Sequence, residues 1–491
     1  MFRRTKIVAT LGPATKDLKV LKSMIEAGVD VVRINFSHGT REEHIANADM
    51  VREIAQEAGI AVGILADLQG PKIRIGKFEK GRINLEVGDK FILDADCKLG
   101  NQECVGLDYK ELPDDVETGA TLMLDDGRIV LGVSMVKGSQ IFCVVEQGGV
   151  LSNNKGINRK GGGLSAPALT SKDMEDIKTA VALQADYLAV SFPRSGDDIR
   201  QARALMTEAG GKCMIMAKIE RTEAIVALDD IIEASDALMV ARGDLAVEVG
   251  DAVVPALQKR MIRAARANNK LVVTATQMLE SMITNPIPTR AEVSDVANAV
   301  LDGTDAVMLS AESAAGRYPV ESVEAMARVC LEAEKEYLVN NDRRMPSAHP
   351  NTIEEAIARA TMFTTASGLK IRAIAALTQS GITALLMSRR SSKVPIFAIS
   401  PNEDTRRKVT LFRGVYPIKF DGALKSGPEE ILRLTEDELL RRGAVRKGDL
   451  MVMTIGEPIG KTGGTNSLKL VRVGEYERLQ KLETERALEN S

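Results

Sequence analysis

The sequence has no tryptophan, only three histidines and only five cysteines among its 491 residues. His38, His44 and His349 are too few and too scattered to build a His-rich zinc site. The cysteines form neither CxxC pairs nor a dense framework, so we expect reduced, mainly structural thiols. No apolar run reaches the roughly 18 residues of a membrane-spanning helix, and residues 1–12 lack a signal-peptide core, so we expect a cytoplasmic protein that does not associate with membranes.

Neither sign of charge dominates. The 65 Lys and Arg residues nearly balance 68 Asp and Glu residues, which gives a net charge of -3. A protein with this balance is not expected to have a broad cationic surface for nucleic acid. The expected partners are therefore small molecules or further copies of this chain. Separately, the length of the chain allows about three domains.

Short apolar runs alternate with amphipathic segments, which is typical of βαβ units and a parallel sheet. Eight runs are predicted to be strands: residues 6–12, 31–37, 62–68, 187–192, 213–220, 237–244, 271–277 and 306–312. Helices are expected between them, for example over residues 41–58, 251–267 and 289–301. This count predicts a TIM (β/α)₈ barrel.

Two segments differ from this alternation. Residues 70–167 are expected to form an inserted small β-barrel domain, hinged near Gly70 and at Gly161 to Gly163, which could act as a lid. Residues 346–474 are expected to form a C-terminal α/β domain and residues 475–491 a charged tail. Residues 1–69 and 168–345 then make up the barrel domain.

Polar residues end each barrel run, and in a TIM barrel such ends meet where active sites are built. Lys218 and Glu220 are two residues apart on one strand, and the next run ends at Asp244. Two carboxylates with substrate and water oxygens suit Mg²⁺, with Mn²⁺ as an alternative. Lys218 could stabilise a phosphoryl group in transit. An interior salt bridge and a Schiff-base lysine are the alternatives.

Other strand ends add weaker signals. Gly243 allows close approach of the backbone to a substrate carboxylate, and Thr276 adds a hydroxyl. Arg33 with Asn35 and Ser37 suits an anion, although a plain strand-to-turn cap explains these three residues too.

Residues 456–462 resemble a P-loop, but they are one residue short and precede a strand-like segment, so we discount that match.

Several motifs together resemble pyruvate kinase, in order and over nearly the whole chain. They include VVRINFSHG, ADLQGPKIR, LSNNKGIN, AKIER, VARGDLAVEVG, ATQMLESMITNPIPTRAE and DGTDAVMLSAESAAGRYP. The resemblance implies a barrel, a lid inserted after the third strand and a regulatory C-terminal domain. It also implies phosphoryl transfer from phosphoenolpyruvate to ADP, which gives pyruvate and ATP, and a homotetramer.

The resemblance assigns residue roles. Glu220 and Asp244 match metal ligands, and Lys218 matches the transition-state cation. Substrate-binding positions are Arg33, Gly243 and Thr276, and Thr276 also lies in the region associated with enolate protonation. The nucleotide side is matched by Asn35, Phe36, Ser37, His38, Arg74 and Lys155.

One departure concerns potassium. Asn35, Ser37, Asp67 and the carbonyl of Leu68 match the monovalent-cation site of potassium-dependent members, which carry Glu where this chain has Lys72. An ammonium group there would supply the positive charge itself, so we expect no potassium requirement. The alternative is that Lys72 points to solvent and the site still fills.

The C-terminal domain has a candidate effector site. Thr378, Ser380, Gly381 and Thr383 lie between a predicted strand and a helix expected to start near Ala384, where hydroxyls and backbone N–H groups can bind an anion. A plain helix cap is the alternative. The resemblance favours a phosphorylated allosteric effector, with Lys461 to Thr465 as a second wall.

Two rival functions stay open at this point: a metal-dependent aldolase or lyase, and a non-catalytic effector-binding paralogue. An aldolase needs no nucleotide-binding lid, and a dead paralogue should have lost a metal ligand or Lys218.

Overall fold

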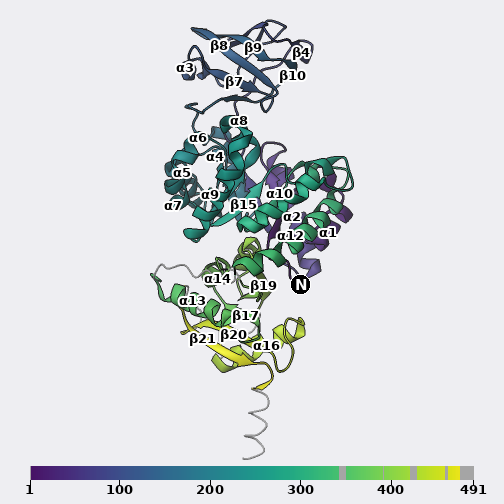
Figure 1. Ribbon diagram of the computed structural model, residues 1–491, viewed down its shortest axis with the longest axis vertical. Helices are drawn as coiled ribbons and strands as arrows, with labels where there is room; N and C mark the ends of the chain where they lie inside the picture. The colour runs from purple at the N-terminus through teal and green to yellow at the C-terminus, as the bar shows by residue number, and fades with distance from the viewer. Residues whose placement is uncertain (1, 342–349, 391, 421–427, 459–462, 476–491) are drawn as a thin grey trace, which may run out of the picture. The chain divides into compact units, whose positions relative to one another are not determined.

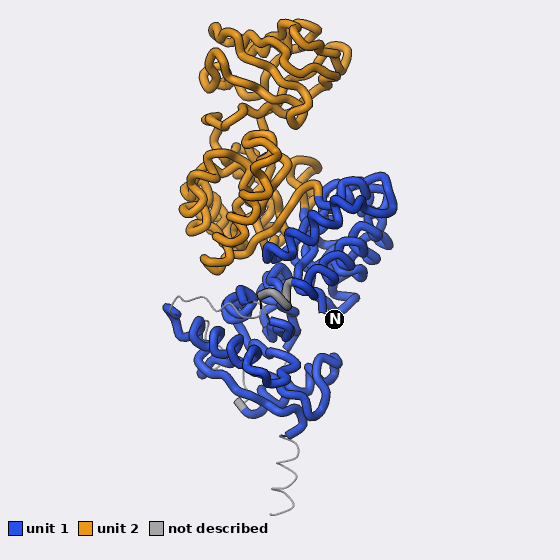
Figure 2. The backbone as a smooth tube through the Cα atoms, viewed as in Figure 1, with its two compact units in different colours: residues 1–33, 47–64, 278–491 blue, residues 34–46, 65–277 orange. Residues whose placement is uncertain are grey.

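The computed structural model describes residues 2–341, 350–390, 392–420, 428–458 and 463–475. The chain has two compact units, one of residues 1–33, 47–64 and 278–491 and the other of residues 34–46 and 65–277 (Figure 2). The expected domain boundary between residues 345 and 346, Lys461 and most of the 475–491 tail lie outside the described residues. No helix in the described part of the chain is long and apolar enough to cross a membrane.

Eight parallel strands close into a barrel in the order β1-β16-β15-β14-β13-β12-β3-β2. All eight predicted runs contain one of them: β1 (Lys6–Thr10), β2 (Val31–Asn35), β3 (Gly63–Asp67), β12 (Tyr187–Val190), β13 (Met214–Ile219), β14 (Ala237–Ala241), β15 (Leu271–Ala275) and β16 (Ala306–Leu309). Strands buried on both faces have continuous apolar sequences. β1, β3, β14 and β15 are buried at every position. The predicted TIM barrel is therefore confirmed.

Helices follow the barrel strands (Figure 1). Thr289 is the N-cap of α10 and forms a capping box with Glu292, and Thr170 does the same for α4 with Asp173. The α-helices are α1 (Leu18–Ala27), α2 (Arg41–Ala58), α4 (Ser171–Ala182), α5 (Gly196–Glu208), α6 (Thr222–Val226), α7 (Leu228–Ala234), α8 (Arg242–Val249), α9 (Val254–Ala267), α10 (Arg290–Asp302), α11 (Ala311–Ala314) and α12 (Pro319–Asn341). Three 3₁₀ turns, η1 (Pro13–Thr15), η2 (Asp251–Val253) and η3 (Glu280–Ile283), complete this set.

The segment after β3 is a β structure, as expected. Six strands pair in the order β11-β7-β8-β9-β5-β6, and β10 pairs with β4. Their inward side chains, such as Phe91, Leu122 and Ile141, form a separate hydrophobic core. The elements are β4 (Arg82–Leu85), β5 (Lys90–Asp94), β6 (Cys104–Gly106), α3 (Leu112–Asp115), β7 (Thr121–Leu124), β8 (Ile129–Lys137), β9 (Gln140–Gln147), β10 (Gly149–Ser152) and β11 (Ile157–Arg159).

The C-terminal α/β segment contains a five-stranded sheet in the order β19-β18-β17-β20-β21, in which only β21 pairs antiparallel. The strand predicted after the P-loop-like residues is β21, which supports the decision to discount that motif. The elements are α13 (Ile353–Ala366), β17 (Ile371–Leu377), α14 (Ile382–Ser388), β18 (Ile396–Ser400), α15 (Glu403–Lys408), η4 (Val409–Leu411), β19 (Val415–Lys419), α16 (Pro428–Arg441), β20 (Leu450–Gly456) and β21 (Thr465–Arg472).

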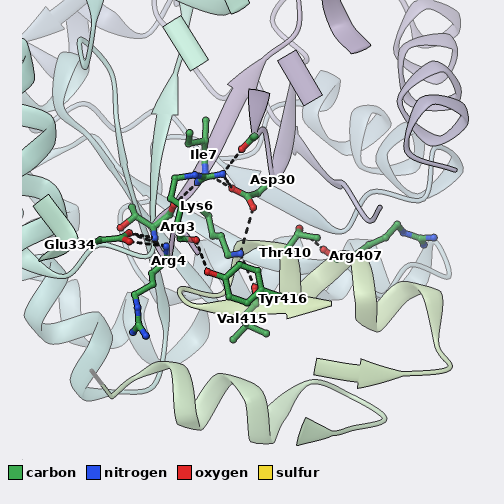
Figure 3. Close-up of polar contacts among 12 residues, drawn as sticks. Arg3, Arg4, Lys6, Ile7, Asp30, Glu334, Arg407, Thr410, Val415 and Tyr416 are labelled. Atoms are coloured by element: carbon green, nitrogen blue, oxygen red, sulfur yellow. Dashed lines mark hydrogen bonds and ion pairs between the residues drawn. The ribbon is translucent and has the colours of Figure 1, made fainter. Parts of the chain in front are cut away.

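A buried ionic cluster surrounds the start of β1 (Figure 3). Lys6 is only 2% exposed, and its Nζ lies 3.5 Å from Asp30 Oδ1 while donating a 2.7 Å hydrogen bond to the Val415 carbonyl of β19. Arg3 Nη2 lies 2.9 Å from Asp30 Oδ2. The fully buried Glu334 accepts hydrogen bonds from the backbone N–H groups of Arg4 and Thr5. The cluster thus links β1 to α12 and to the C-terminal sheet.

Candidate active site

Lys218 lies at the centre of a polar cluster at the end of β13. Its Nζ is 3.0 Å from Glu220 Oε1 and 3.2 Å from Asp67 Oδ1, and it donates a 2.7 Å hydrogen bond to Ser191 Oγ. These groups come from the ends of three neighbouring strands, β13, β3 and β12, as expected for a barrel active site. The interior salt bridge that the sequence left as an alternative is present, and it involves two carboxylates.

Glu220 is almost fully buried, and burial raises the pKa of its carboxyl group. The Lys218 ammonium opposes this shift, whereas the charges of Asp244 and Asp67 add to it. The backbone N–H of Phe192 donates a 2.9 Å hydrogen bond to Glu220 Oε2, which fixes the orientation of the carboxylate. Such a concentration of buried negative charge favours a bound cation.

Asp244 lies in a different element from the one predicted. β14 ends at Ala241, and Asp244 occupies the first turn of helix α8, where an acidic side chain interacts favourably with the helix dipole. Lys72 Nζ lies 3.1 Å from Asp244 Oδ1, with the two side chains 28% and 23% exposed. The alternative in which Lys72 points to solvent therefore does not hold in this structure.

The Gly243 N–H and the Thr276 side chain contact each other. Gly243 N donates a 2.8 Å hydrogen bond to Thr276 Oγ1, which itself donates to the Ala275 carbonyl at 2.7 Å. A carboxylate that binds Gly243 N would have to replace the first of these bonds. Thr276 has a φ of 66°, an unfavourable value for a β-branched residue, and such strain occurs often at functional sites.

The residues after β2 form a tight turn. Ser37 N donates a 3.1 Å hydrogen bond to Asn35 Oδ1, and His38 is exposed. Phe36 is fully buried and stacks on His44 with ring centroids 4.4 Å apart, so its side chain supports the turn and does not face a ligand. Arg33, on β2, donates a 3.2 Å hydrogen bond to Thr10 Oγ1.

Arg74 and Lys155 lie at the two junctions of the inserted β segment. Arg74 Nη1 donates a 3.0 Å hydrogen bond to the Asn154 carbonyl, next to Lys155 in the chain, and the two junctions also pair through a backbone bridge between Arg74 and Gly156. Lys155 Nζ is 2.7 Å from Asp125 Oδ1. The structure therefore brings these two distant segments together.

The predicted monovalent-cation residues are partly engaged with the Lys218 cluster. The Leu68 carbonyl accepts a 2.7 Å hydrogen bond from Ser191 Oγ, and Asp67 is paired with Lys218. The sequence analysis assigns no role to Ser191, which is one of the polar residues near the end of the run over residues 187–192. Its position at the end of β12, beside β13, was the signal that could have placed it next to Lys218.

The candidate effector residues surround the start of α14, which begins at Ile382, two residues before the expected position. Thr378 Oγ1 accepts a 2.8 Å hydrogen bond from Gly381 N, and the Thr383 and Thr465 hydroxyls lie 2.7 Å apart. Ser380 is exposed. Thr465 of the predicted second wall thus contacts this site.

Comparisons with known proteins decide the family. A model described as "Pyruvate kinase, barrel domain" matches residues 2–323, and one described as "Pyruvate kinase, alpha/beta domain" matches residues 355–471. The chain belongs to the pyruvate kinase family. It is 54% identical over 480 residues to pyruvate kinase II of Salmonella typhimurium, which covers 96% of this chain and 99% of that protein.

Two further pyruvate kinases support this assignment. The protein of Haemophilus influenzae is 54% identical over 460 residues, covering 93% of this chain and 96% of its own length. That of Corynebacterium glutamicum is 42% identical over 483 residues, covering 98% of this chain and all of its own. As a member of the pyruvate kinase family, this chain is a phosphotransferase that converts phosphoenolpyruvate and ADP to pyruvate and ATP. The family also implies a divalent-metal requirement.

In this chain, a buried carboxyl group near the second junction of the inserted segment should make stability depend on pH. Glu248 is 5% exposed, and its Oε2 accepts a 2.9 Å hydrogen bond from Thr222 N. Burial, reinforced by the nearby Glu223 charge, raises the pKa of Glu248 from 4.5 to about 7. Between these values the folded state holds a proton that the unfolded state releases, so stability falls as pH rises through this window.

We expect Glu248→Gln, which cannot ionise, to be more stable than the wild type by about 1–3 kcal/mol at pH 8, with the difference disappearing near pH 4.5. Urea unfolding curves across this pH range measure the effect. Glu208→Gln, at an exposed position on α5, is the matched control and should not change the pH profile. An equal effect of the two substitutions would contradict this interpretation of Glu248.

Proposed function

We propose that this enzyme uses Mg²⁺, held by Glu220 and Asp244, with Lys218 as the cation that stabilises the phosphoryl group in transit. The proposal rests on the burial of Glu220 close to Asp244 and on the Lys218 ammonium 3.0 Å from Glu220. Hard carboxylate oxygens fit this metal, and Mn²⁺ is the alternative. No group of three or more His, Cys, Asp and Glu side chains suitable for a metal occurs among the described residues, so substrate and water oxygens would complete the coordination.

When bound, the metal ion would neutralise charge on the substrate oxygens. Lys218 presents a compact cation whose attraction grows as negative charge develops on the phosphoryl oxygens. Arg33, Gly243 and Thr276 bind phosphoenolpyruvate in this proposal, and Thr276 lies where the enolate is protonated. Asn35, Phe36, Ser37, His38, Arg74 and Lys155 form the nucleotide side, with Phe36 acting through its backbone.

The metal assignment is tested by coupled assays of ATP formation. Treatment with EDTA should abolish activity, and Mg²⁺ or Mn²⁺ should restore it. Glu220→Gln should need a much higher metal concentration, whereas Glu208→Gln should behave as the wild type. Unchanged metal dependence of Glu220→Gln would show that the ion binds elsewhere.

We further propose that potassium is not required, because Lys72 carries a positive charge into the site beside Asp244. Its 3.1 Å distance from Asp244 Oδ1 supports this role. Asn35, Ser37, Asp67 and Leu68, which match a potassium site, would then work without the ion. We expect less than a tenfold rise in rate when potassium chloride is added to a bulky organic-cation buffer at matched ionic strength. A tenfold rise would correspond to lowering the activation free energy by about 1.4 kcal/mol.

Lys72→Glu tests the same idea by reversing the charge. This variant should be impaired without potassium and at least partly rescued by it. Lys77→Glu, at an exposed position of the same segment, is the control and should show no such rescue. A potassium-dependent wild type would refute the proposal.

The remaining assignments concern regulation and assembly. We propose that Thr378, Ser380, Gly381 and Thr383 bind a phosphorylated effector, such as a sugar phosphate or a nucleoside monophosphate. The proximity of Thr465 to Thr383 supports a common pocket wall.

We also propose that the enzyme is a homotetramer. In each chain, residues 1–69 and 168–345 form the barrel domain, residues 70–167 a lid and residues 346–474 a regulatory domain.

Ser380→Asp should weaken or abolish activation by such compounds, because an added carboxylate repels a phosphate. Measuring the half-saturating phosphoenolpyruvate concentration with a panel of effectors gives the result. Ser367→Asp, at an exposed position after α13, is the control. Full activation of Ser380→Asp would remove this serine from the effector site.

A further inference from the structure

Two cysteines that are seven residues apart in the sequence lie close together in the inserted β segment. The Sγ atoms of Cys97 and Cys104 are 3.6 Å apart, and both residues are partly exposed. The other three cysteines, Cys143, Cys213 and Cys330, are buried. The sequence predicted reduced, structural thiols, and all five cysteines are free, but only this pair combines proximity with access to solvent.

The backbone holds the two thiols in this arrangement. Asn101 N donates a 2.8 Å hydrogen bond to the Cys104 carbonyl, and Asn101 Oδ1 accepts from Cys104 N at 3.0 Å, so the intervening loop turns back on itself. Cys104 begins β6, which pairs with β5 just before Cys97. A disulfide needs an S–S distance of about 2.0 Å, so the sulfurs would move together by roughly 1.5 Å, a shift that small side-chain rotations can supply.

We propose that Cys97 and Cys104 form a reversible oxidation site, at which a hydroperoxide converts the two thiols into an intramolecular disulfide. The Cys97 thiolate attacks the O–O bond and becomes a sulfenic acid, releasing water or an alcohol. Cys104 then attacks the Cys97 sulfur, forming the S–S bond and releasing water. In total the two thiols lose two electrons and two protons, and with hydrogen peroxide the products are two water molecules.

The surroundings support this order of events. Cys97 lines a cavity of about 550 Å³, together with Arg74, Lys98 and Lys110, so a small oxidant can approach this residue from the cavity. Burial, with the neighbouring Cys97 thiol, raises the pKa of Cys104 to about 11. A thiol that is mostly protonated at neutral pH is a poor first nucleophile, so Cys104 is assigned the second step.

The disulfide would stiffen the loop between Cys97 and Cys104, next to strands β5 and β6. Gly100, inside the closed loop, accepts a 2.9 Å hydrogen bond from Glu79 N and donates a 2.8 Å bond to the Lys77 carbonyl. These contacts connect the loop to the segment that carries Arg74. Oxidation is therefore expected to slow amide hydrogen exchange across residues 98–104 and to leave exchange in β8 unchanged.

The test treats the full-length enzyme with hydrogen peroxide and counts thiols under denaturing conditions. The wild type should lose two of its five thiols, and a reductant should restore both. Mass spectrometry of peptides should find Cys97 linked to Cys104 within one chain. Cys213→Ser, which removes a buried thiol elsewhere, should still lose two, whereas Cys104→Ser should form no intramolecular disulfide.

Retention of all five thiols after oxidation, or a disulfide that joins other cysteines or two chains, would overturn the proposal. The outcome is independent of catalysis, because thiol counts and peptide links are measured without an activity assay. The assigned order also places the sulfenic acid on Cys97, so peroxide-treated Cys104→Ser should be labelled by a sulfenic-acid reagent and Cys97→Ser should not. Labelling of Cys97→Ser alone would contradict the assigned roles.

Discussion

Lys218→Met should abolish phosphoryl transfer, with a loss in kcat of about 10³-fold or more. The reason is that the Lys218 ammonium group itself contacts Glu220, Asp67 and Ser191, and methionine has no charge to replace it. Methionine keeps the length of the side chain but removes its charge. A charge that acts chiefly while the phosphoryl group is in transit lowers kcat more than it raises KM. Steady-state assays with phosphoenolpyruvate and ADP measure the effect.

The structure also predicts a cost in stability for this variant. Lys218 is paired with two buried carboxylates, and their loss of a partner should destabilise the fold by about 3 kcal/mol. Assays should therefore be made well below the melting temperature, after confirming the fold by circular dichroism. Lys178→Met, at an exposed position on α4, is the matched control. A folded Lys218→Met enzyme with near wild-type turnover would exclude the assigned role.

The barrel could be predicted from the sequence because its strands are buried on both faces. Strands β1 and β15 are buried at every position and consist mostly of apolar residues. The caps at Thr170 and Thr289 follow local rules that need no tertiary information. Strand ends were less predictable. The predicted strand over residues 237–244 includes Asp244, because neither Arg242 nor Gly243 marks a clear end of that run. In the structure β14 ends at Ala241 and helix α8 begins at Arg242.

The contacts within the candidate site depended on segments that are distant in the sequence. The approach of Lys72 to Asp244 spans 172 residues, and no local pattern encodes it. Gly243 N was expected to be available for a ligand, but the Thr276 hydroxyl accepts its hydrogen bond. Lys218 and Glu220 could be paired in advance because both lie in one predicted run, although β13 ends at Ile219 and Glu220 follows it directly. Cys97 and Cys104 do not fit any spacing rule, and it is the turn at Asn101 and the pairing of β6 with β5 that place them together.

Asp30→Ala is expected to destabilise the protein by about 3 kcal/mol or more, because it leaves the buried ammonium group of Lys6 without its carboxylate partner. Burial lowers the pKa of Lys6, and the Asp30 charge opposes this shift. In the variant the pKa of Lys6 should fall further, so the destabilisation should shrink as pH rises and Lys6 becomes neutral. Urea unfolding at several pH values measures both effects.

Asp49→Ala, at an exposed position on α2, is the control and should change stability by less than about 0.5 kcal/mol. A similarly small effect of Asp30→Ala would mean that Lys6 is adequately stabilised by the Val415 carbonyl and by the Tyr416 ring, whose centroid lies 4.5 Å from Nζ. Comparing Asp30→Ala with Asp30→Asn separates loss of charge from loss of the hydrogen bond that Asp30 accepts from Ile7 N at 2.8 Å.

A double-mutant cycle isolates the contribution of the ion pair itself. Lys6→Met removes the buried charge, and a thioether packs favourably beside an aromatic ring such as that of Tyr416. If the cost of Asp30→Asn comes from an unpaired ammonium group, the Lys6→Met/Asp30→Asn double variant should be more stable than Asp30→Asn alone by at least about 1 kcal/mol. If the two substitutions instead add, Asp30 acts mainly through Arg3 Nη2, which lies 2.9 Å from its other oxygen.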